Sequence, residues 1–546
     1  MTDNKDFTKF SRRGFLVGTG GLVLASALPT KFASAQTAPT YTRYNVSSDE
    51  GLAMLDSYKI AITEMLNRPP CDPHNWYRNA LVHTLDCPHG NWWFLPWHRG
   101  YMGWFEKTCR KLSGNPNFAF PYWDWTEEPY VPDVFFDGVL DPCHDAFIQS
   151  YEVFMRDFRN PMSQFWDSLS PAQVEQLGLY KYDSFDDFWE YVESIFPPPG
   201  KARNLTRGNS GFDEETQTAV SEDTILEALS DKYFAGFNNT SDDDELKYKF
   251  VGFGSGPADH HGMMVSQGII EAQPHNLVHN IVGGIFEDKT AGFMADNLSP
   301  TDPIFFMHHS NMDRLWDVWT RKQESFGLPT LPIGSRLDKW REEPFLFFID
   351  DNGNPLLNGK AQDYEVIGDF DYGYTPGSGE SIIPKRKSKG KVSRSVKVFR
   401  SAVTAASALN FTQLSTRNIN LPYTDFRAAV AEAATSHVAA EITIQPPANV
   451  RGVSFNVLVN PPKGARNIGF DSPHFAGAFQ FFGTHRHSGP ITFTIPLTKA
   501  LKALAKNNKL GIDMCEPLEI AVVPNTKGIT INSLEAALES VTIKIF

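Results

Sequence analysis

Histidines gather in two parts of this chain, among acidic and aromatic residues. The first group consists of His83, Cys87, His89 and His98. The second group consists of Glu271, His275, Asn276, His279, His308, His309 and Asp313. Sites made only of imidazole suit copper or zinc and lack the carboxylates that magnesium and manganese prefer. Two groups of three or more histidines therefore predict two metal ions.

Spacing within the second group adds geometry. His275 and His279 are four residues apart, so on a helix both rings point from one face toward one metal. His309 and Asp313 share that spacing. We expect Asp313 to orient a ligand histidine by accepting the hydrogen bond of its second ring nitrogen.

Three helices are predicted to position these residues, over 52–67, over 97–112 and from Asp302 to a stop before Gly327. Asp302 is the predicted N-cap, and Pro303 lies in the first turn. The acidic region 127–254 is expected to be a mixed, loop-rich elaboration of the helical core.

The amino-acid composition and the apolar periodicity change after residue 375. Residues 376–395 contain Gly, Ser, Pro and the basic run 385–391, which predicts a solvated linker. Alternating apolar residues follow over 453–459, 491–495, 518–522 and 541–545, with a helical insert near 498–506. This period of two predicts a small all-β sandwich or barrel over 396–546.

Composition and the N-terminus bound the class of protein. The 546 residues are 41% hydrophobic and carry a net charge of −14, without a basic stripe outside the linker, so nucleic acid is not an expected partner. Residues 11–16 form a twin-arginine signature before an apolar stretch ending at Leu28, and Ala33-Ser34-Ala35 predicts cleavage before Gln36. We expect export to the periplasm or medium. No later stretch is expected to span a membrane. The five cysteines are too few for a disulfide scaffold.

Four segments together carry a family resemblance. They are His89–Glu106 with Phe94-Leu95-Pro96-Trp97-His98-Arg99, Pro121–Trp125, Asp302–His309 followed by Asp313, and Phe370–Tyr374. The first and third resemble the two copper signatures of tyrosinases and polyphenol oxidases, and the resemblance covers roughly residues 45–375. It implies a mainly α catalytic domain over 36–375, in which a four-helix bundle holds a type-3 copper pair. It also implies oxidation of phenols or catechols to ortho-quinones, with O2 as co-substrate.

Ligands follow from the resemblance position by position. The first copper takes His83, His89 and His98, and the second takes His275, His279 and His309, which leaves His308 as a buried neighbour. His74 is an alternative to His83. We prefer His83 because residues 76–86 are predicted to form a helix that would aim the His83 ring inward. The pair His260-His261 is a further alternative, expected to be a polar loop.

Three other roles are implied. Cys87 stands two residues before His89, as in fungal members whose cysteine is joined to the histidine ring by a thioether. Glu271 and Asn276 match a pair that holds a basic water in the family, and together they would deprotonate a monophenol. The stretch 474–483 resembles the C-terminal domain of plant-type polyphenol oxidases, and its apolar loop is expected to place Phe475 or another aromatic over the copper site. The enzyme would then be latent until the C-terminal domain is displaced, for example by cleavage in the basic linker.

Other classes of function remain open. An ortho-aminophenol oxidase would use the same scaffold and ligands. A haemocyanin-like O2 carrier shares the copper site, although a single copper domain behind an export signal disfavours it. A zinc hydrolase is the third alternative. The oligomeric state and the natural phenol are left undetermined.

Overall fold

The computed structural model describes the chain from Pro39 to Ile545, with gaps. The described residues are 39–180, 182–237, 249–287, 290–385, 397–401, 406–409, 415–420, 438–446, 453–463, 468–483, 489–506, 517–525 and 536–545. The predicted export signal, Cys515 and residues 386–391 of the basic run lie outside them.

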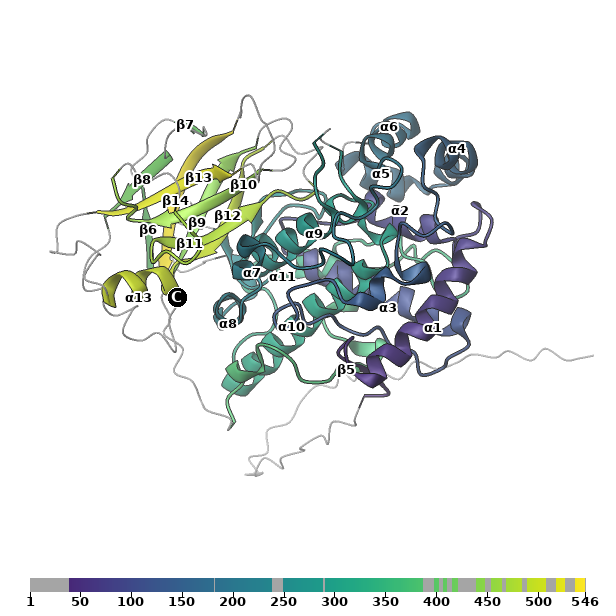
Figure 1. Ribbon diagram of the computed structural model, residues 1–546, viewed down its shortest axis with the longest axis horizontal. Helices are drawn as coiled ribbons and strands as arrows, with labels where there is room; N and C mark the ends of the chain where they lie inside the picture. The colour runs from purple at the N-terminus through teal and green to yellow at the C-terminus, as the bar shows by residue number, and fades with distance from the viewer. Residues whose placement is uncertain are drawn as a thin grey trace, which may run out of the picture. The chain divides into compact units, whose positions relative to one another are not determined.

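Helices dominate up to residue 342 (Figure 1). The long ones are α1 (Asp49–Leu66), α2 (Trp76–Asp86), α3 (Phe94–Ser113), α4 (Tyr151–Asp167) and α10 (Ile304–Phe326). The shorter ones are α5 (Pro171–Leu179), α6 (Phe185–Ile195), α7 (Glu214–Ala219), α8 (Glu222–Ser230), α9 (Asn276–Gly283) and α11 (Leu337–Glu342). The predicted helices are confirmed as α1, α3 and α10, and α2 has the predicted bounds.

Local signals explain where the long helices begin and end. The Ser48 side chain caps α1 by accepting a hydrogen bond from the Gly51 backbone. Both α3 and α10 end at a glycine with positive φ, Gly114 at 70° and Gly327 at 67°. A residue without a Cβ adopts that conformation at least cost, which fixes these two C-termini.

The region 127–254 is more helical than predicted. It contains α4 to α8, and each of these helices begins at a serine or aspartate whose side chain accepts a backbone N–H of the first turn. The five caps are Ser150, Ser170, Ser184, Asp213 and Ser221.

The C-terminal part is a two-sheet β structure, as predicted, with α13 (Thr498–Lys506) as its helical insert. One sheet has the order β11 (Phe475–Gln480), β10 (Ser454–Val459), β13 (Leu518–Asn525), β8 (Ser415–Ile419). The other has the order β4 (Ser266–Gln267), β12 (Ile491–Pro496), β9 (Val438–Gln445), β14 (Ala537–Ile545), β6 (Lys397–Arg400), and β7 (Ser407–Ala408) pairs with β14. Inward apolar residues of both sheets form one core, in which Phe479 stacks on Phe493 at 4.3 Å.

One strand joins the two parts of the molecule. β4 belongs to the helical part, yet Ser266 and Gln267 pair in parallel with Thr492 and Phe493 of β12. Three residues after β4, residues 271–275 form a π-helical turn that leads into α9. The C-terminal sheet is therefore hydrogen-bonded to the segment that carries part of the second histidine group.

Candidate metal centre

The first histidine group is assembled from α2, the loop after it and α3. His83 lies on α2, His98 lies on α3, and Cys87 and His89 lie between these helices. All four side chains are buried, and one ligand atom from each lies within 4.8 Å of the others. The alternative ligand His74 lies elsewhere, with its Nε2 2.9 Å from the Asp350 carbonyl.

The second group is assembled from the π-helical turn, α9 and α10. His275 ends the turn, His279 lies one turn into α9, and His308 and His309 lie on α10. These four rings are also buried, with ligand atoms within 4.8 Å of one another. The two groups adjoin, because the rings of His98 and His309 stack at 4.1 Å.

Four of these histidines have the outer ring nitrogen fixed by an oxygen acceptor. Because an oxygen acceptor requires a proton on Nδ1, the Nε2 atom of each neutral ring carries the lone pair. The acceptors are the carbonyls of Asn297 for His83 (2.8 Å), Phe94 for His98 (2.8 Å) and Met294 for His279 (2.7 Å), and the Asn276 Oδ1 for His275 (2.8 Å).

The inner nitrogens of His83 and His275 are available to bind metal. Burial lowers the pKa of His83 and of His275 to about 3, so both rings are neutral at pH 7. Their Nε2 atoms are buried and have no hydrogen-bond partner among the described residues. The Nε2 atoms of His279 and His309 lie 3.2 Å apart. Neutral imidazoles converging through Nε2 are a donor set that fits copper.

His308 differs from its neighbour His309. The Trp125 indole donates a hydrogen bond to its Nδ1 at 3.1 Å, so the proton of a neutral His308 ring resides on Nε2. That tautomer offers no lone pair to a metal through Nε2. The geometry therefore favours His309 as the ligand and His308 as a neighbour.

Comparison with known proteins places this site in a family. Residues 63–322, which hold both histidine groups, match the family model of the common central domain of tyrosinase. This part of the chain is a tyrosinase central domain. The chain is 26% identical to the latent form of a chloroplastic polyphenol oxidase of Prunus armeniaca, over 86% of this chain and 69% of that protein. It is 24% identical to tyrosinase HcTyr1 of Hahella sp., over 61% of this chain and 63% of that protein.

Coverage differs among the relatives of this chain. It is 27% identical to a chloroplastic polyphenol oxidase of Spinacia oleracea, but the match spans only 42% of that protein. Among solved structures, a latent aurone synthase aligns with a TM-score of 0.55 at 18% identity, over 94% of this chain and 90% of the other. Latent apple tyrosinase aligns with a TM-score of 0.55 at 21% identity, over 93% and 97%. These likenesses confirm the predicted fold class, a helical core followed by a C-terminal β domain.

Cys87 lies against two histidines of the first group. Its sulfur is 3.7 Å from the Nε2 of His89 and 3.4 Å from the Nε2 of His98. Cys71, Cys109 and Cys143 are also free thiols. The thioether between Cys87 and His89 stays a prediction, which this proximity makes reasonable.

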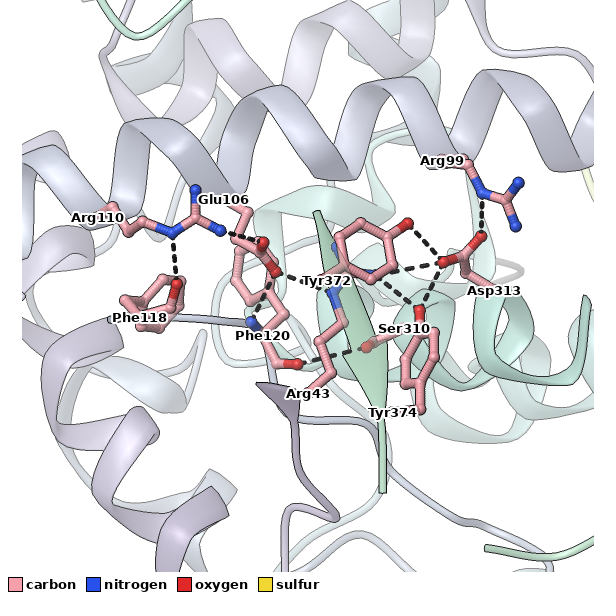
Figure 2. Close-up of polar contacts among 10 residues, drawn as sticks. All are labelled: Arg43, Arg99, Glu106, Arg110, Phe118, Phe120, Ser310, Asp313, Tyr372 and Tyr374. Atoms are coloured by element: carbon pink, nitrogen blue, oxygen red, sulfur yellow. Dashed lines mark hydrogen bonds and ion pairs between the residues drawn. The ribbon is translucent and has the colours of Figure 1, made fainter. Parts of the chain in front are cut away.

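Asp313 does not have the predicted partner. Its Oδ1 accepts from Arg99 at 2.7 Å, and its Oδ2 accepts from the hydroxyls of Tyr372 (2.6 Å) and Tyr374 (2.5 Å) (Figure 2). The outer nitrogen of His309 has no partner among the described residues. Helical spacing brings Asp313 near His309, but the guanidinium groups of Arg99 and Arg43 and two tyrosine hydroxyls saturate its carboxylate. The expectation that it orients His309 is therefore wrong.

Asp313 instead joins the two helices that carry His98 and His309. Arg99 directly follows His98 on α3, and Asp313 lies one turn after His309 on α10. Figure 2 shows Tyr372 and Tyr374 reaching the carboxylate from the strand β5 (Tyr372–Tyr374). Burial would raise the pKa of Asp313, but Arg99, Arg43 (whose Nη1 lies 3.4 Å from Oδ2) and the tyrosine hydroxyls lower it.

Asp313→Ala should destabilise the fold strongly. It leaves the buried Arg99 guanidinium and two tyrosine hydroxyls without their acceptor, which costs about 3–5 kcal/mol of unfolding free energy. Asp317→Ala is the matched control one turn further along α10, because its partner Arg321 is 40% exposed and an exposed pair contributes less than about 1 kcal/mol. Thermal denaturation of the metal-free chains measures both. Equal losses in the two variants would contradict a bracing role for Asp313.

Glu271 and Asn276 lie beside the site but do not contact each other through any described hydrogen bond. The Glu271 carboxylate accepts from the Gly90 backbone at 2.6 Å and from the Ser255 hydroxyl at 2.5 Å. Burial raises the pKa of Glu271 to about 8, although both hydrogen bonds oppose the rise. The Asn276 amide donates to Gln267 Oε1 at 2.8 Å and to the Gln480 carbonyl of the C-terminal domain at 2.9 Å.

Phe482, rather than Phe475, covers the histidines. Its ring lies 4.3 Å from the ring of His279, 4.9 Å from that of His89 and 5.5 Å from that of His275. Phe475 begins β11, so the predicted apolar loop is mostly a strand, and its ring packs on Phe470 at 5.1 Å. The prediction that an aromatic of this stretch covers the site agrees with the structure, but the choice of Phe475 does not.

Two further aromatic rings border the site and were not singled out from the sequence. Phe94 lies 4.7 Å from His98 and from His275, and Phe305 lies 4.2 Å from His309. Both precede a candidate ligand histidine by four residues on a helix, which is a signal that sequence spacing could have given.

Proposed function

We propose that this oxidoreductase uses two copper ions and O2 to oxidise phenols or catechols to ortho-quinones. The observation that supports it most is the convergence of neutral Nε2 atoms from two adjoining histidine groups. His83, His89 and His98 would hold one copper, and His275, His279 and His309 the other. When bound, the copper pair supplies the two-electron chemistry that couples the substrate ring to O2.

The chain's own residues would hold the metals and sort the substrates. Carbonyl acceptors fix the ring tautomers before metal arrives, so the ligand set is preorganised. Phe94, Phe305 and Phe482 make the surroundings apolar and aromatic. Such walls exclude water and suit the flat ring of a phenol once Phe482 has left.

We further propose that the protein is latent while the C-terminal domain is docked. Phe482 occupies the face of the histidines where a phenol ring would bind. The Gln480 carbonyl accepts a hydrogen bond from the side-chain amide of Asn276, and β12 is paired with β4. Displacing the domain would uncover the rings and free the Asn276 amide to bind a water. The basic run 385–391 is the segment in which we expect cleavage.

Monophenols would need a base as well as copper. With Gln480 gone, Asn276 and Glu271 would position a water between them, and Glu271 would accept its proton. Burial raises the pKa of Glu271 to about 8, so the ionised carboxylate is a stronger base than an ordinary one, and its share increases as the pH rises toward 8. Catechols are easier to oxidise and would depend less on this base.

The remaining parts of the proposal concern processing. Residues 1–35 would direct export by the twin-arginine route, 36–375 would form the catalytic domain and 376–395 the linker. The Cys87 sulfhydryl would lose its hydrogen, and the His89 ring one C–H hydrogen, to O2 as oxidant when the thioether forms. No helix within the described residues is both long and apolar enough to cross a membrane.

Oxygen consumption by the copper-loaded, proteolysed chain tests the proposed function. We expect turnover of 4-tert-butylcatechol with growing quinone absorbance, and no turnover by the zinc-loaded chain. Binding of O2 without turnover would indicate a carrier. Faster consumption with 2-aminophenol than with any catechol would indicate an aminophenol oxidase instead.

Glu271→Gln should separate the two phenol activities. The amide keeps the shape of the carboxylate but accepts no proton, so monophenol kcat should fall about 100-fold or more while catechol kcat changes little. Tyrosine and dopa, assayed with the same copper-loaded enzyme, provide the two rates. Parallel losses on both substrates would mean that Glu271 only positions the loop at Gly90.

A further inference from the structure

A cavity opens beside the first histidine group, away from the second. It measures about 70 Å³, and its lining residues include Cys87, His89, Leu179, Tyr180, His261 and Gly483. Its described lining residues include neither Phe482 nor any histidine of the second group. A molecule in this cavity would therefore meet His89 from a side that the Phe482 ring does not cover.

The outer end of the cavity reaches the surface at the end of α5. Leu179, the last residue of α5, is 41% exposed, and the neighbouring Tyr180 is partly exposed. Cys87 and His89 at the inner end are only 6% and 5% exposed. The cavity thus runs from solvent to a ligand histidine without crossing the ring that covers the copper-facing side.

The wall of this cavity is braced within the helical part of the molecule. His261 lies between two carboxylates, with Nδ1 2.7 Å from Glu343 and Nε2 3.0 Å from Asp86. Burial would lower the pKa of His261, but these carboxylates outweigh it and raise the pKa to about 9. Asp86 also accepts from the Trp97 indole at 2.9 Å. The predicted polar loop at His260-His261 therefore includes buried ionic contacts of His261 with Glu343 and Asp86. These contacts do not involve the C-terminal domain.

The size of the cavity limits which molecules can enter it. A buried water needs roughly 10–15 Å³ of such space, so the cavity holds several waters or one molecule the size of O2 or hydrogen peroxide. We propose that it is a lateral entrance through which O2, water and peroxide reach the first histidine group while the C-terminal domain is docked. This inference rests on the proposed oxidase function. It implies that latency excludes phenols but not O2.

Cysteine labelling of the full-length, metal-free chain tests the entrance without any enzymatic readout. Methyl methanethiolsulfonate is the small reagent and fluorescein-5-maleimide the bulky one, with each site quantified by peptide mass. Cys87 and Cys109 are both buried, but of these two thiols Cys87 alone is among the described lining residues of the cavity. We expect the small reagent to modify Cys87 more slowly than the exposed Cys71 and Cys143 but several-fold faster than Cys109. The bulky reagent should spare Cys87.

Two variants on α5 locate the route. Leu179→Trp fills the outer end and should slow Cys87 modification several-fold, whereas Val174→Trp, on the same helix at a half-exposed position away from the cavity, should not. If Cys87 reacts no faster than Cys109, the cavity is closed and the proposal is wrong. If Leu179→Trp has no effect while Phe482→Ala accelerates labelling, small molecules enter from the copper-facing side instead. Neither result depends on copper or phenol turnover, so the oxidase proposal stands or falls separately.

Discussion

Replacing His309 or His98 by alanine should lower the copper content from two ions per chain to about one and remove catechol oxidation. In the proposed centre each ring would supply one of three neutral nitrogens to its metal, and the outer nitrogen of His98 is already fixed by the Phe94 carbonyl. Even residues that only support a ligand change metal affinity about 10- to 100-fold, so loss of a ligand should exceed that. Metal analysis after dialysis and oxygen consumption with 4-tert-butylcatechol measure the two effects.

His308→Gln is the matched control on the same helix. Because its Nδ1 accepts from Trp125, the ring of His308 is not expected to bind metal. The variant should keep both copper ions and lose about 1–3 kcal/mol of stability from the disturbed buried hydrogen bond. Loss of copper in His308→Gln with retention in His309→Ala would reverse the assignment of the two neighbours.

Phe482→Ala should activate the uncut, copper-loaded chain. The ring packs on His279, His89 and His275, so the docked state loses roughly 1.5–3 kcal/mol of apolar burial when it is removed. If opening limits the rate, catechol oxidation should rise about 10- to 100-fold. Limited trypsin treatment should then raise the activity of this variant far less than that of the parent chain.

Phe455→Ala separates uncovering of the site from general loosening. Phe455 lies inside the sandwich, where it stacks on Phe479 at 5.2 Å, and its loss should lower the melting temperature. We expect this variant to remain latent. Phe475→Ala tests a different role, the docking of the C-terminal domain. Phe475 packs in one apolar cluster with Leu277 of α9 and therefore helps to hold the domain in place. Equal activation by Phe455→Ala would remove the special role of Phe482.

Strong periodicity made most of the fold predictable. Helix α2 and the strands β10, β12, β13 and β14 follow from apolar spacing alone. Helices α5 to α8 were missed because they are short, and α4 was missed because Pro161 lies inside it, so their capping serines and Asp213 were the better signal. Asp313 illustrates a different limit. Its spacing from His309 was read correctly, but Arg99, Tyr372 and Tyr374 come from other segments of the chain. Sequence spacing cannot show which of several donors forms the hydrogen bonds to a carboxylate.

The choice between Phe475 and Phe482 depended on register. Phe475 pairs with Leu458 in the strand, where its ring packs with Phe470 and the apolar cluster around Leu277. Phe482 follows the end of the strand and is free of that alternation. A period of two identifies inward and outward positions within a strand but says nothing of the residue just beyond it.

The carbonyl acceptors of the ligand histidines have a consequence for how the sequence can drift. His83, His98 and His279 are oriented by main-chain oxygens of Asn297, Phe94 and Met294. A main-chain carbonyl is present whichever side chain a position carries, so substitutions at Asn297 or Met294 leave the tautomers of His83 and His279 intact. Of the four histidines whose outer nitrogen meets an oxygen within the described residues, His275 alone relies on a side chain, that of Asn276. Mutational robustness is thus uneven across the centre, and a library of single substitutions should find Asn276 the least replaceable of these four acceptor positions.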